Sequence, residues 1–371
     1  MALGARTRGW LAPLACAVLL VAGCGGAAGP EPAAPTAKAT TPPATATPNE
    51  TPESTATATA TATPEPPARR TIATGLSVPW GIAFLPNGDA LVSERTTARI
   101  LRIPAGGGKP RRVMTVPGVA RNAGEGGLLG IAVRDEWVYA YLTSSSDNRI
   151  ARFKLGGKTH VLLRGLQRAA IHNGGRIAFG PDGKLYAGVG DAGNTANAQN
   201  LGVRNGKILR LNADGSGARI WSSGHRNVQG LAWDRSKRLW ATEFGQDTRD
   251  EVNLIKRGRN YGWPVVEGMG STQGGKYTNP KLTWPTDEAS PSGAAIIGKH
   301  LYVAALQGEC VYKIPLDGAS VGKPVKLLAG ELGRIRTVAA APDGTLWVAT
   351  SNRDGRGSPR DGDDRIIAIR I

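Results

Sequence analysis

One predicted hairpin, in the stretch IHNGGRIAFGPDGKLYAGVGDAG, carries His172 just before its first strand and Asp191 just after its second. Gly174 and Gly175 follow the histidine and allow a backbone or a ligand to approach closely. Imidazole is a natural general base near neutral pH, and a carboxylate returning to the start of its hairpin orients the ring and strengthens it as a base. A lone histidine is more often structural, so its neighbours in space decide between the two interpretations.

Three other loops carry polar side chains at the corresponding point, just before an apolar strand. Glu125 lies in NAGEGGLLGIAV, Arg226 and Asn227 lie in SSGHRNVQGLAW, and Arg334 and Arg336 lie in ELGRIRTVAAAPDG. Alternate residues of an extended segment point to the same side, so Arg334 and Arg336 are placed to address one anion. The set favours a site for a flat, multiply acidic ligand.

The elements that must position these residues repeat along the chain. A strand, a turn and a second strand recur six times, for example as GIAFLPNGDALVSER, RIAFGPDGKLYAGVGD and TVAAAPDGTLWVATSN. A third apolar segment follows each hairpin, and the last of these, DRIIAIRI, ends at Ile371. Repeats at a spacing of about 44 to 63 residues indicate propeller blades. The sequence therefore predicts an all-β, six-bladed β-propeller, in which the last strand pairs with residues 70–75 to close the ring.

Several classes of function are disfavoured by the same inspection. The chain carries no evident Ser-His-Asp set, no zinc-type His/Cys cluster and no phosphate-binding glycine loop before a helix. The formal net charge is +17, but no lysine and arginine run is dense enough to predict nucleic-acid binding. We interpret the charge as compatibility with an anionic cell envelope, with some arginines kept for an anionic cofactor.

The N-terminal residues predict secretion. Residues 1–23 have the basic start and short apolar run of a signal peptide, and small residues directly before Cys24 look like a lipobox. Residues 24–68 are rich in Pro, Thr and Ala and predict a disordered tether, which leaves residues 69–371 for the propeller. We expect Cys24 to be acylated and the protein to be anchored by this lipid alone to the outer face of the cell membrane. An ordinary signal peptide with a coincidental cysteine is the alternative.

Read together, the motifs resemble those of a known family. VPWGIAFLPNG, GEGGLLGIA, the His172 stretch, NGKILRLNADGS, GHRNVQGLAW and DEVNLIKRGRNYGWP follow one another in order between Thr71 and Ile371. They are similar to the soluble quinoprotein glucose/sorbosone dehydrogenases, which include bacterial aldose sugar dehydrogenases. The resemblance implies a six-bladed propeller that binds pyrroloquinoline quinone (PQQ) and a calcium ion over its axis.

The resemblance also assigns roles. His172 is implied as the base that takes the proton of the sugar hydroxyl, with Asp191 behind it. Calcium, Arg226 and Asn227 are implied to polarise the quinone carbonyl while hydride passes to the quinone. The positions that correspond to cofactor-carboxylate ligands are Arg334 and Arg336.

Further implied positions concern metal and substrate. The backbone carbonyls of Gly245 and Gln246 correspond to ligands of the catalytic calcium, and hard cations prefer such oxygen ligands. A second calcium would use the Glu251 carboxylate and the Tyr261 carbonyl, although Glu251 is equally well a fixed surface carboxylate. Trp284 corresponds to an aromatic wall against the substrate, or else packs within a blade.

Two departures from the family pattern bear on the cofactor. Gln307 stands where many relatives have a lysine or arginine, and Glu125 where some have glutamine, which predicts weaker binding of an anionic cofactor. The expected activity is oxidation of aldose sugars at C1 to lactones, with electrons passed to an extracytoplasmic acceptor. A non-catalytic binding module at the cell surface and a calcium-dependent lactonase are the alternatives.

Overall fold

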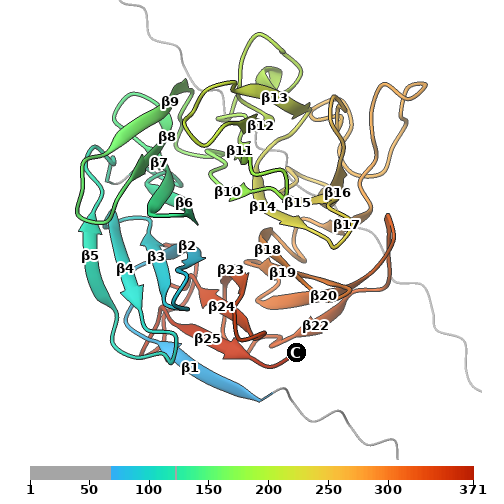
Figure 1. Ribbon diagram of the computed structural model, residues 1–371. Helices are drawn as coiled ribbons and strands as arrows, with labels where there is room; N and C mark the ends of the chain where they lie inside the picture. Colours follow the sequence, from blue (N-terminus) through green and yellow to red (C-terminus); the bar gives the residue numbers. More distant parts are fainter. Residues whose placement is uncertain (1–67, 122) are drawn as a thin grey trace, which may run out of the picture. The chain divides into compact units, whose positions relative to one another are not determined.

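Six antiparallel sheets surround a central axis in the computed structural model, which describes residues 68–121 and 123–371 (Figure 1). Blade one holds β2 (Pro79–Phe84), β3 (Ala90–Glu94), β4 (Arg99–Ile103) and β5 (Arg111–Thr115). Blade two holds β6 (Leu128–Arg134), β7 (Trp137–Thr143), β8 (Asn148–Phe153) and β9 (His160–Leu166). Blade three holds β10 (Ile177–Phe179), β11 (Leu185–Val189), β12 (Lys207–Leu211) and β13 (Arg219–Ser223).

The remaining blades complete the ring. Blade four holds β14 (Val228–Trp233), β15 (Leu239–Glu243), β16 (Arg249–Ile255) and β17 (Leu282–Pro285). Blade five holds β18 (Pro291–Ile297), β19 (His300–Ala305), β20 (Cys310–Asp317), β21 (Ser320–Val321) and β22 (Val325–Leu327). Blade six holds β23 (Ile335–Ala340), β24 (Leu346–Thr350), β25 (Ile366–Ile369) and β1 (Arg69–Ala73). The six-bladed propeller predicted from the repeats is confirmed.

Ring closure also follows the prediction. The first strand, β1, is the outermost strand of blade six and pairs antiparallel with β25, with Arg69 opposite Ile369. Both ends of the described propeller therefore lie in one blade. Among the described residues the only helical segment is a single 3-10 turn at Thr195–Ala198, and none of their helices is long and apolar enough to span a membrane.

Local sequence explains the hairpins. In blades one, three and six a glycine at the turn adopts positive φ, at Gly88, Gly183 and Gly344. Each donates its N–H to the carbonyl three residues earlier, at 2.9, 2.9 and 3.0 Å. Glycine suits this conformation because it has no Cβ to clash. The same short turn thus joins the first two strands of each of these blades.

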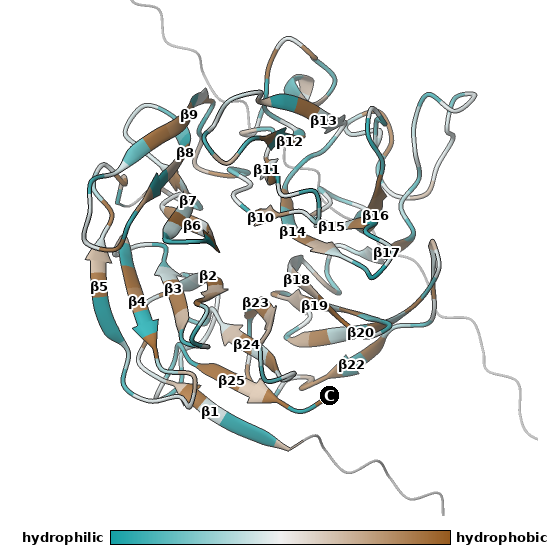
Figure 2. Ribbon diagram, viewed as in Figure 1, coloured by the Kyte–Doolittle hydropathy of each residue, from teal (hydrophilic) through white to brown (hydrophobic). Residues whose placement is uncertain are grey.

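The core lies between neighbouring blades, where the faces of the sheets meet. Hydrophobic residues run along the strands of all six blades (Figure 2). The largest buried side chains include Trp80, Trp240 and Trp347, each no more than 2% exposed. Because each blade buries its faces against its neighbours, the innermost strands are held firmly, and the loops that lead into them sit on a rigid frame.

Candidate functional site

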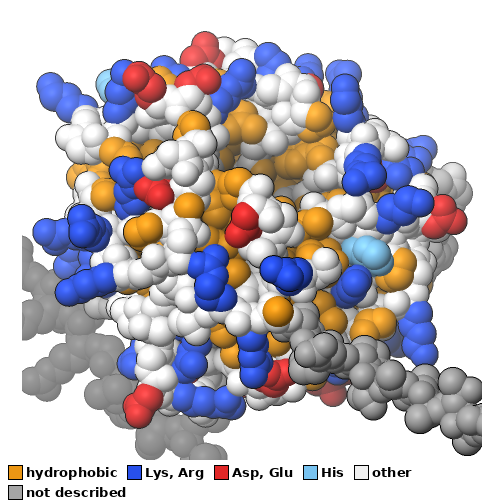
Figure 3. Space-filling model, turned by 60° about the horizontal axis from the view of Figure 1, so that its bottom comes forward, with side chains coloured by type: hydrophobic (Ala, Val, Ile, Leu, Met, Phe, Trp, Pro, Cys, Tyr) orange, Lys and Arg blue, Asp and Glu red, His pale blue; other side chains and the backbone are white. Residues whose placement is uncertain are grey.

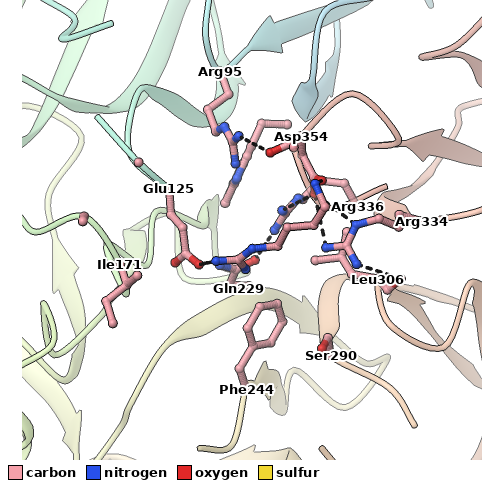
Figure 4. Close-up of a pocket in the computed structure, with 15 residues that line it drawn as sticks. Arg95, Glu125, Ile171, Gln229, Phe244, Ser290, Leu306, Arg334, Arg336 and Asp354 are labelled. Atoms are coloured by element: carbon pink, nitrogen blue, oxygen red, sulfur yellow. Dashed lines mark hydrogen bonds and ion pairs between the residues drawn. The ribbon is translucent and has the colours of Figure 1, made fainter. Parts of the chain in front are cut away.

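Two adjoining cavities, of about 430 and 490 Å³, are lined by the loops that lead into or out of the inner strands. The first is called the arginine cavity (Figure 4) and the second the histidine cavity. They share five lining residues, so they form one cleft: Glu125, Ile171, Phe244, Ser290 and Arg356. Every blade contributes at least one side chain to it: Arg95, Glu125, His172, Arg226, Ser290 and Arg334. Loops from all six blades therefore meet at one cleft, and several of the residues predicted from the sequence line it.

His172 lines the histidine cavity and is backed by two buried partners. Its Nδ1 lies 2.8 Å from Oδ1 of Asp191, whose side chain is fully buried. The other carboxylate oxygen of Asp191 accepts a hydrogen bond from Nε1 of Trp263 at 2.9 Å. These two hydrogen bonds fix the plane of the imidazole and direct Nδ1 to the carboxylate. Nε2 is left as the ring nitrogen for proton transfer.

The backbone around His172 is unusually constrained. Its φ is 54°, in the left-handed region that side chains other than glycine rarely adopt. Its N–H donates to Oε2 of Glu125 at 3.0 Å, and its carbonyl accepts from Ala192 N at 3.1 Å. A Cβ on Gly190 would lie 1.9 Å from that carbonyl oxygen, so the glycine makes the close approach possible. The strain is held in place by the site itself, as is common at functional positions.

The arginine cavity is lined by several buried, positively charged side chains. Arg95, Arg334 and Arg336 are each no more than 7% exposed. Burial, followed by repulsion from Arg95, lowers the pKa of Arg336 to about 9. Asp354 is the buried counter-charge, 3.2 Å from Nε of Arg334 and 3.6 Å from Nη2 of Arg336. Burial alone would raise the pKa of Asp354, but Arg336 and Arg334 outweigh it and lower that pKa.

Several donors near this cleft are buried and unpaired. Among the described residues, Nε of Arg95, Nε of Arg226, Nε of Arg336 and Nδ2 of Asn227 have no hydrogen-bond partner. Leaving such groups unsatisfied is costly, so a ligand rich in carboxylate and carbonyl oxygens fits the cleft. Asn227 is further fixed because its Oδ1 accepts the N–H of Gly174 at 3.0 Å. These observations fit PQQ as the sequence predicts it.

Gly245 and Gln246 line the histidine cavity beside Arg226. The following turn directs the N–H groups of residues 246–249 to one carboxylate oxygen of Glu267, at 2.6 to 3.2 Å. These bonds lower the pKa of Glu267 in spite of its burial. The carbonyl oxygens of Gly245 and Gln246 accept no hydrogen bond from a described residue, so they are available to a hard cation such as calcium.

The predicted second calcium site is less open. Glu251 is buried, and burial followed by repulsion from Glu243 raises its pKa to about 8. Its two oxygens accept hydrogen bonds from Gly268 N at 2.7 Å and Asn253 Nδ2 at 2.8 Å. Within the described part of the chain no group of three or more His, Cys, Asp or Glu side chains is arranged to hold a metal. Glu251 is thus no surface carboxylate, and its role with Tyr261 as a calcium site stays a prediction.

Of two further predicted residues, Gln307 lines the cleft and Trp284 does not. Gln307 lines the histidine cavity, though not the arginine cavity, so it reaches the site as a neutral side chain. Trp284, in β17, is 6% exposed and tilts against Tyr312 at a centroid distance of 4.7 Å. It lines neither cavity and belongs to a hydrophobic cluster between blades four and five, which supports packing rather than a substrate wall.

Sequence reasoning missed several residues of the cleft. Arg95 directly follows β3, and Trp263 lies in the long connection between β16 and β17. Asp354 and Arg356 lie between β24 and β25, in the charged segment SNRDGRG. The predictions after second strands were limited to blades three, four and five, as with Asp191, Gly245 and Gln307, so the corresponding loops of blades one and six were overlooked. A run of alternating charges and glycines at the corresponding point of blade six was the available signal.

Asp250 is another missed residue, and it lies deep in the histidine cavity. Its oxygens accept the N–H groups of Gly245 at 2.9 Å and Ser290 at 2.6 Å. Burial raises the pKa of Asp250 to about 7. It ties blade four to the entrance of blade five under the cleft.

Comparisons with known proteins identify the family. The glucose/sorbosone dehydrogenase family model matches residues 76–359. The chain belongs to that family. An aldose sugar dehydrogenase from Streptomyces coelicolor, solved with PQQ bound, is 49% identical with a TM-score of 0.77, over 82% of this chain and 98% of that one.

Curated relatives of the family are more distant. The aldose sugar dehydrogenase YliI of Escherichia coli is 28% identical over 76% of this chain and 89% of its own. Quinoprotein glucose dehydrogenase B of Acinetobacter calcoaceticus is 31% identical over 57% of this chain and 55% of its own. The chain thus spans about half of that second relative and most of the first.

The N-terminal predictions lie outside the described residues. These are the signal peptide of residues 1–23, acylation at Cys24 and the tether up to residue 67. Cys310, the one cysteine in the described part of the chain, is buried and free. Lys and Arg side chains are spread over the face seen in Figure 3, with few acidic side chains between them.

Proposed function

We propose that this protein is a PQQ- and calcium-dependent aldose dehydrogenase that oxidises sugars at C1 to lactones. The observation that carries the proposal is the shared cleft. A His172–Asp191 pair opens into the same space as Arg334 and Arg336, which are buried in excess over their counter-charge. The 49% identical relative solved with PQQ supports the same cofactor, and the sugar dehydrogenases among the relatives support the same substrate class.

The positions of the residues and the family resemblance support the following roles. Arg334 and Arg336 would hold carboxylates of the cofactor, Arg226 and Asn227 would bind its carbonyl side, and the carbonyls of Gly245 and Gln246 would hold calcium. When bound, PQQ would supply the acceptor for the hydride of the sugar C1, and calcium would supply a Lewis acid for its carbonyl.

His172 removes the proton of the C1 hydroxyl through Nε2, and Asp191 stabilises the imidazolium that results. One proton and one hydride leave the sugar, so the cyclic hemiacetal becomes a lactone. The two electrons are then passed to an acceptor outside the cytoplasm.

The test is reconstitution of the purified protein. Wild-type protein is titrated with PQQ and calcium and assayed for dye reduction with a panel of aldoses, beside His172→Ala. His160→Ala is the matched control, because His160 is exposed on β9 and lines neither cavity. Sugar-dependent reduction that needs both additions and is lost only in His172→Ala supports the proposal. Binding of PQQ without reduction of the dye by any aldose would favour the binding module.

We also propose that residues 1–23 direct export, that acylated Cys24 anchors the protein, and that residues 24–68 tether the propeller at the outer face of the membrane. The small residues before Cys24 and the Pro, Thr and Ala composition after it support this. Mass spectrometry of the N-terminal peptide tests it, together with fractionation of Cys24→Ser. An unmodified Cys24 peptide, or a variant that stays in the membrane fraction, would contradict lipid anchoring.

A further inference from the structure

Arg356 reaches across the mouth of the cleft from blade six to blade two. It leaves the loop between β24 and β25 and lines both cavities, and its Nη2 lies 3.0 Å from Oε1 of Glu125. Its own N–H donates to Asp354 Oδ1 at 2.9 Å, which fixes the base of the side chain. Figure 4 shows Glu125 and Asp354 at different sides of the arginine cavity, with guanidinium groups between them.

The charges that line the arginine cavity give Arg356 its significance. Among the described lining residues four carry a guanidinium and two carry a carboxylate: Arg95, Arg334, Arg336 and Arg356, against Glu125 and Asp354. The surplus is two positive charges, and Arg356 supplies half of it. Gln307, on the neighbouring wall of the cleft, adds none. A ligand with several carboxylates therefore depends on Arg356 for its charge balance.

Arg356 also differs from the other arginines in its freedom to move. The side chains of Arg334 and Asp354 are 8% and 3% exposed, whereas those of Arg356 and Glu125 are 61% and 21% exposed. An ion pair this open to water contributes little, so exchanging Glu125 for a ligand carboxylate costs little. The planar guanidinium can grip such a carboxylate with two parallel hydrogen bonds.

We propose that Arg356 is a further cofactor-binding residue, a clamp whose guanidinium turns from Glu125 to a carboxylate of the bound quinone and closes the mouth of the cleft. This inference rests on the proposed function, because it takes PQQ as the ligand. Glu125 keeps its second oxygen on the N–H of His172, at 3.0 Å, so it stays in place when Arg356 moves. The buried arginines bind the ligand from below, and Arg356 holds it from the solvent side.

The experiment measures binding of PQQ by the full-length protein without sugar, so it does not depend on turnover. The equilibrium constant comes from quenching of tryptophan fluorescence, and the dissociation rate comes from dilution of the loaded protein. The variants are Arg356→Ala and Arg356→Lys, beside Arg360→Ala. Arg360 lies in the same loop, bonds the carbonyl of Glu331 at 2.9 Å and lines neither cavity, so its loss removes the same charge outside the cleft.

We expect Arg356→Ala to weaken PQQ binding roughly tenfold, mainly through faster dissociation, because a clamp acts after the ligand has entered. Arg356→Lys keeps the charge but loses the two parallel donors of the planar guanidinium, so we expect the affinity for PQQ to fall roughly threefold. Arg360→Ala should stay within about twofold of the wild type. Equal melting temperatures for the variants exclude misfolding as the cause.

Two results overturn the inference in distinguishable ways. If Arg356→Ala binds and releases PQQ as Arg360→Ala does, Arg356 is no clamp, while the proposed function stands. If the wild type itself does not bind PQQ, both the proposed function and the role of Arg356 as a clamp are refuted.

Discussion

Replacement of Asp191 by asparagine tests the catalytic reasoning most directly. The change keeps the size of the side chain but removes the charge that lies 2.8 Å from Nδ1 of His172, where both groups are almost fully buried. An imidazolium and a carboxylate with charge centres about 4 Å apart attract each other by about 4 kcal/mol at an effective dielectric constant of about 20. Loss of that attraction predicts a kcat roughly a thousandfold lower.

The hydrogen-bonding pattern of an asparagine also predicts a loss of activity. The amide NH2 of asparagine would face either the N–H of Trp263 or Nδ1 of His172. In the first case the hydrogen bond that holds the side chain at position 191 is lost, and in the second the His172 ring is forced into the other tautomer, with its proton on Nε2. The assay is steady-state dye reduction at saturating PQQ, calcium and sugar. Affinity for PQQ should be unchanged, because Asp191 lines neither cavity.

A second histidine–carboxylate pair supplies the control. His225 and Glu243 lie 2.9 Å apart in blade four, and His225 is fully buried and lines neither cavity. Glu243→Gln should lower the melting temperature while the folded protein keeps most of its kcat. If Asp191→Asn keeps a kcat within about tenfold of the wild type, the carboxylate is not stabilising an imidazolium and the assignment of His172 as the base is refuted.

Three further predictions concern the frame around the site. Trp263→Phe removes the indole N–H that donates to the Asp191 carboxylate. We expect kcat to fall roughly 10- to 100-fold, because a hydrogen bond to a charged group is worth about 1.5–3 kcal/mol. An unchanged kcat would show that this bond is dispensable. Gly190→Ala forces a Cβ to within 1.9 Å of the carbonyl oxygen of His172 and should lower the unfolding free energy by about 3 kcal/mol in urea titrations. Asp250 has a pKa of about 7 in the folded state against 3.8 ordinarily, so the folded state binds this proton more tightly than the unfolded state does. Proton binding therefore stabilises the folded state by up to about 4 kcal/mol below pH 3.8, and this contribution is lost as the pH rises to about 7. Unfolding with chelator present should therefore show a flatter pH dependence in Asp250→Asn, and equal slopes would contradict the buried carboxyl.

The fold could be predicted because its signals are local. Each blade begins with a hairpin whose turn needs only a few residues, and closure of the ring by β1 and β25 follows from counting strands. Site residues directly before inner strands were predictable for the same reason. Arg95 and Arg356 were not, because the curvature of the ring brings them to the cleft and no motif marks them. Asp191 and Gly245 also follow second strands, but the hairpin pattern and the family resemblance pointed to them.

The two histidine–carboxylate pairs mark the limit of pattern reading. His225 precedes an inner strand and pairs with a carboxylate at the end of the next strand, as His172 does. The difference is depth: His225 stacks on Tyr261 at 5.0 Å and is sealed, whereas His172 borders the cleft. Which of two similar loops lies deeper is set by packing between blades, and that packing is absent from the pattern of a single blade.

The closure of blade six also has a consequence for how the ring is made. β1 is the first strand of the propeller to leave the ribosome and β25 is the last, yet each needs the other as its partner. The chain between them must be complete before the blade can form, so β1 waits as an exposed edge throughout synthesis. Its RRTIA sequence begins with two arginines, the kind of charge that discourages an edge strand from pairing with another chain. Chains cut short before Ile366 would carry six complete inner strands and still not form a closed ring.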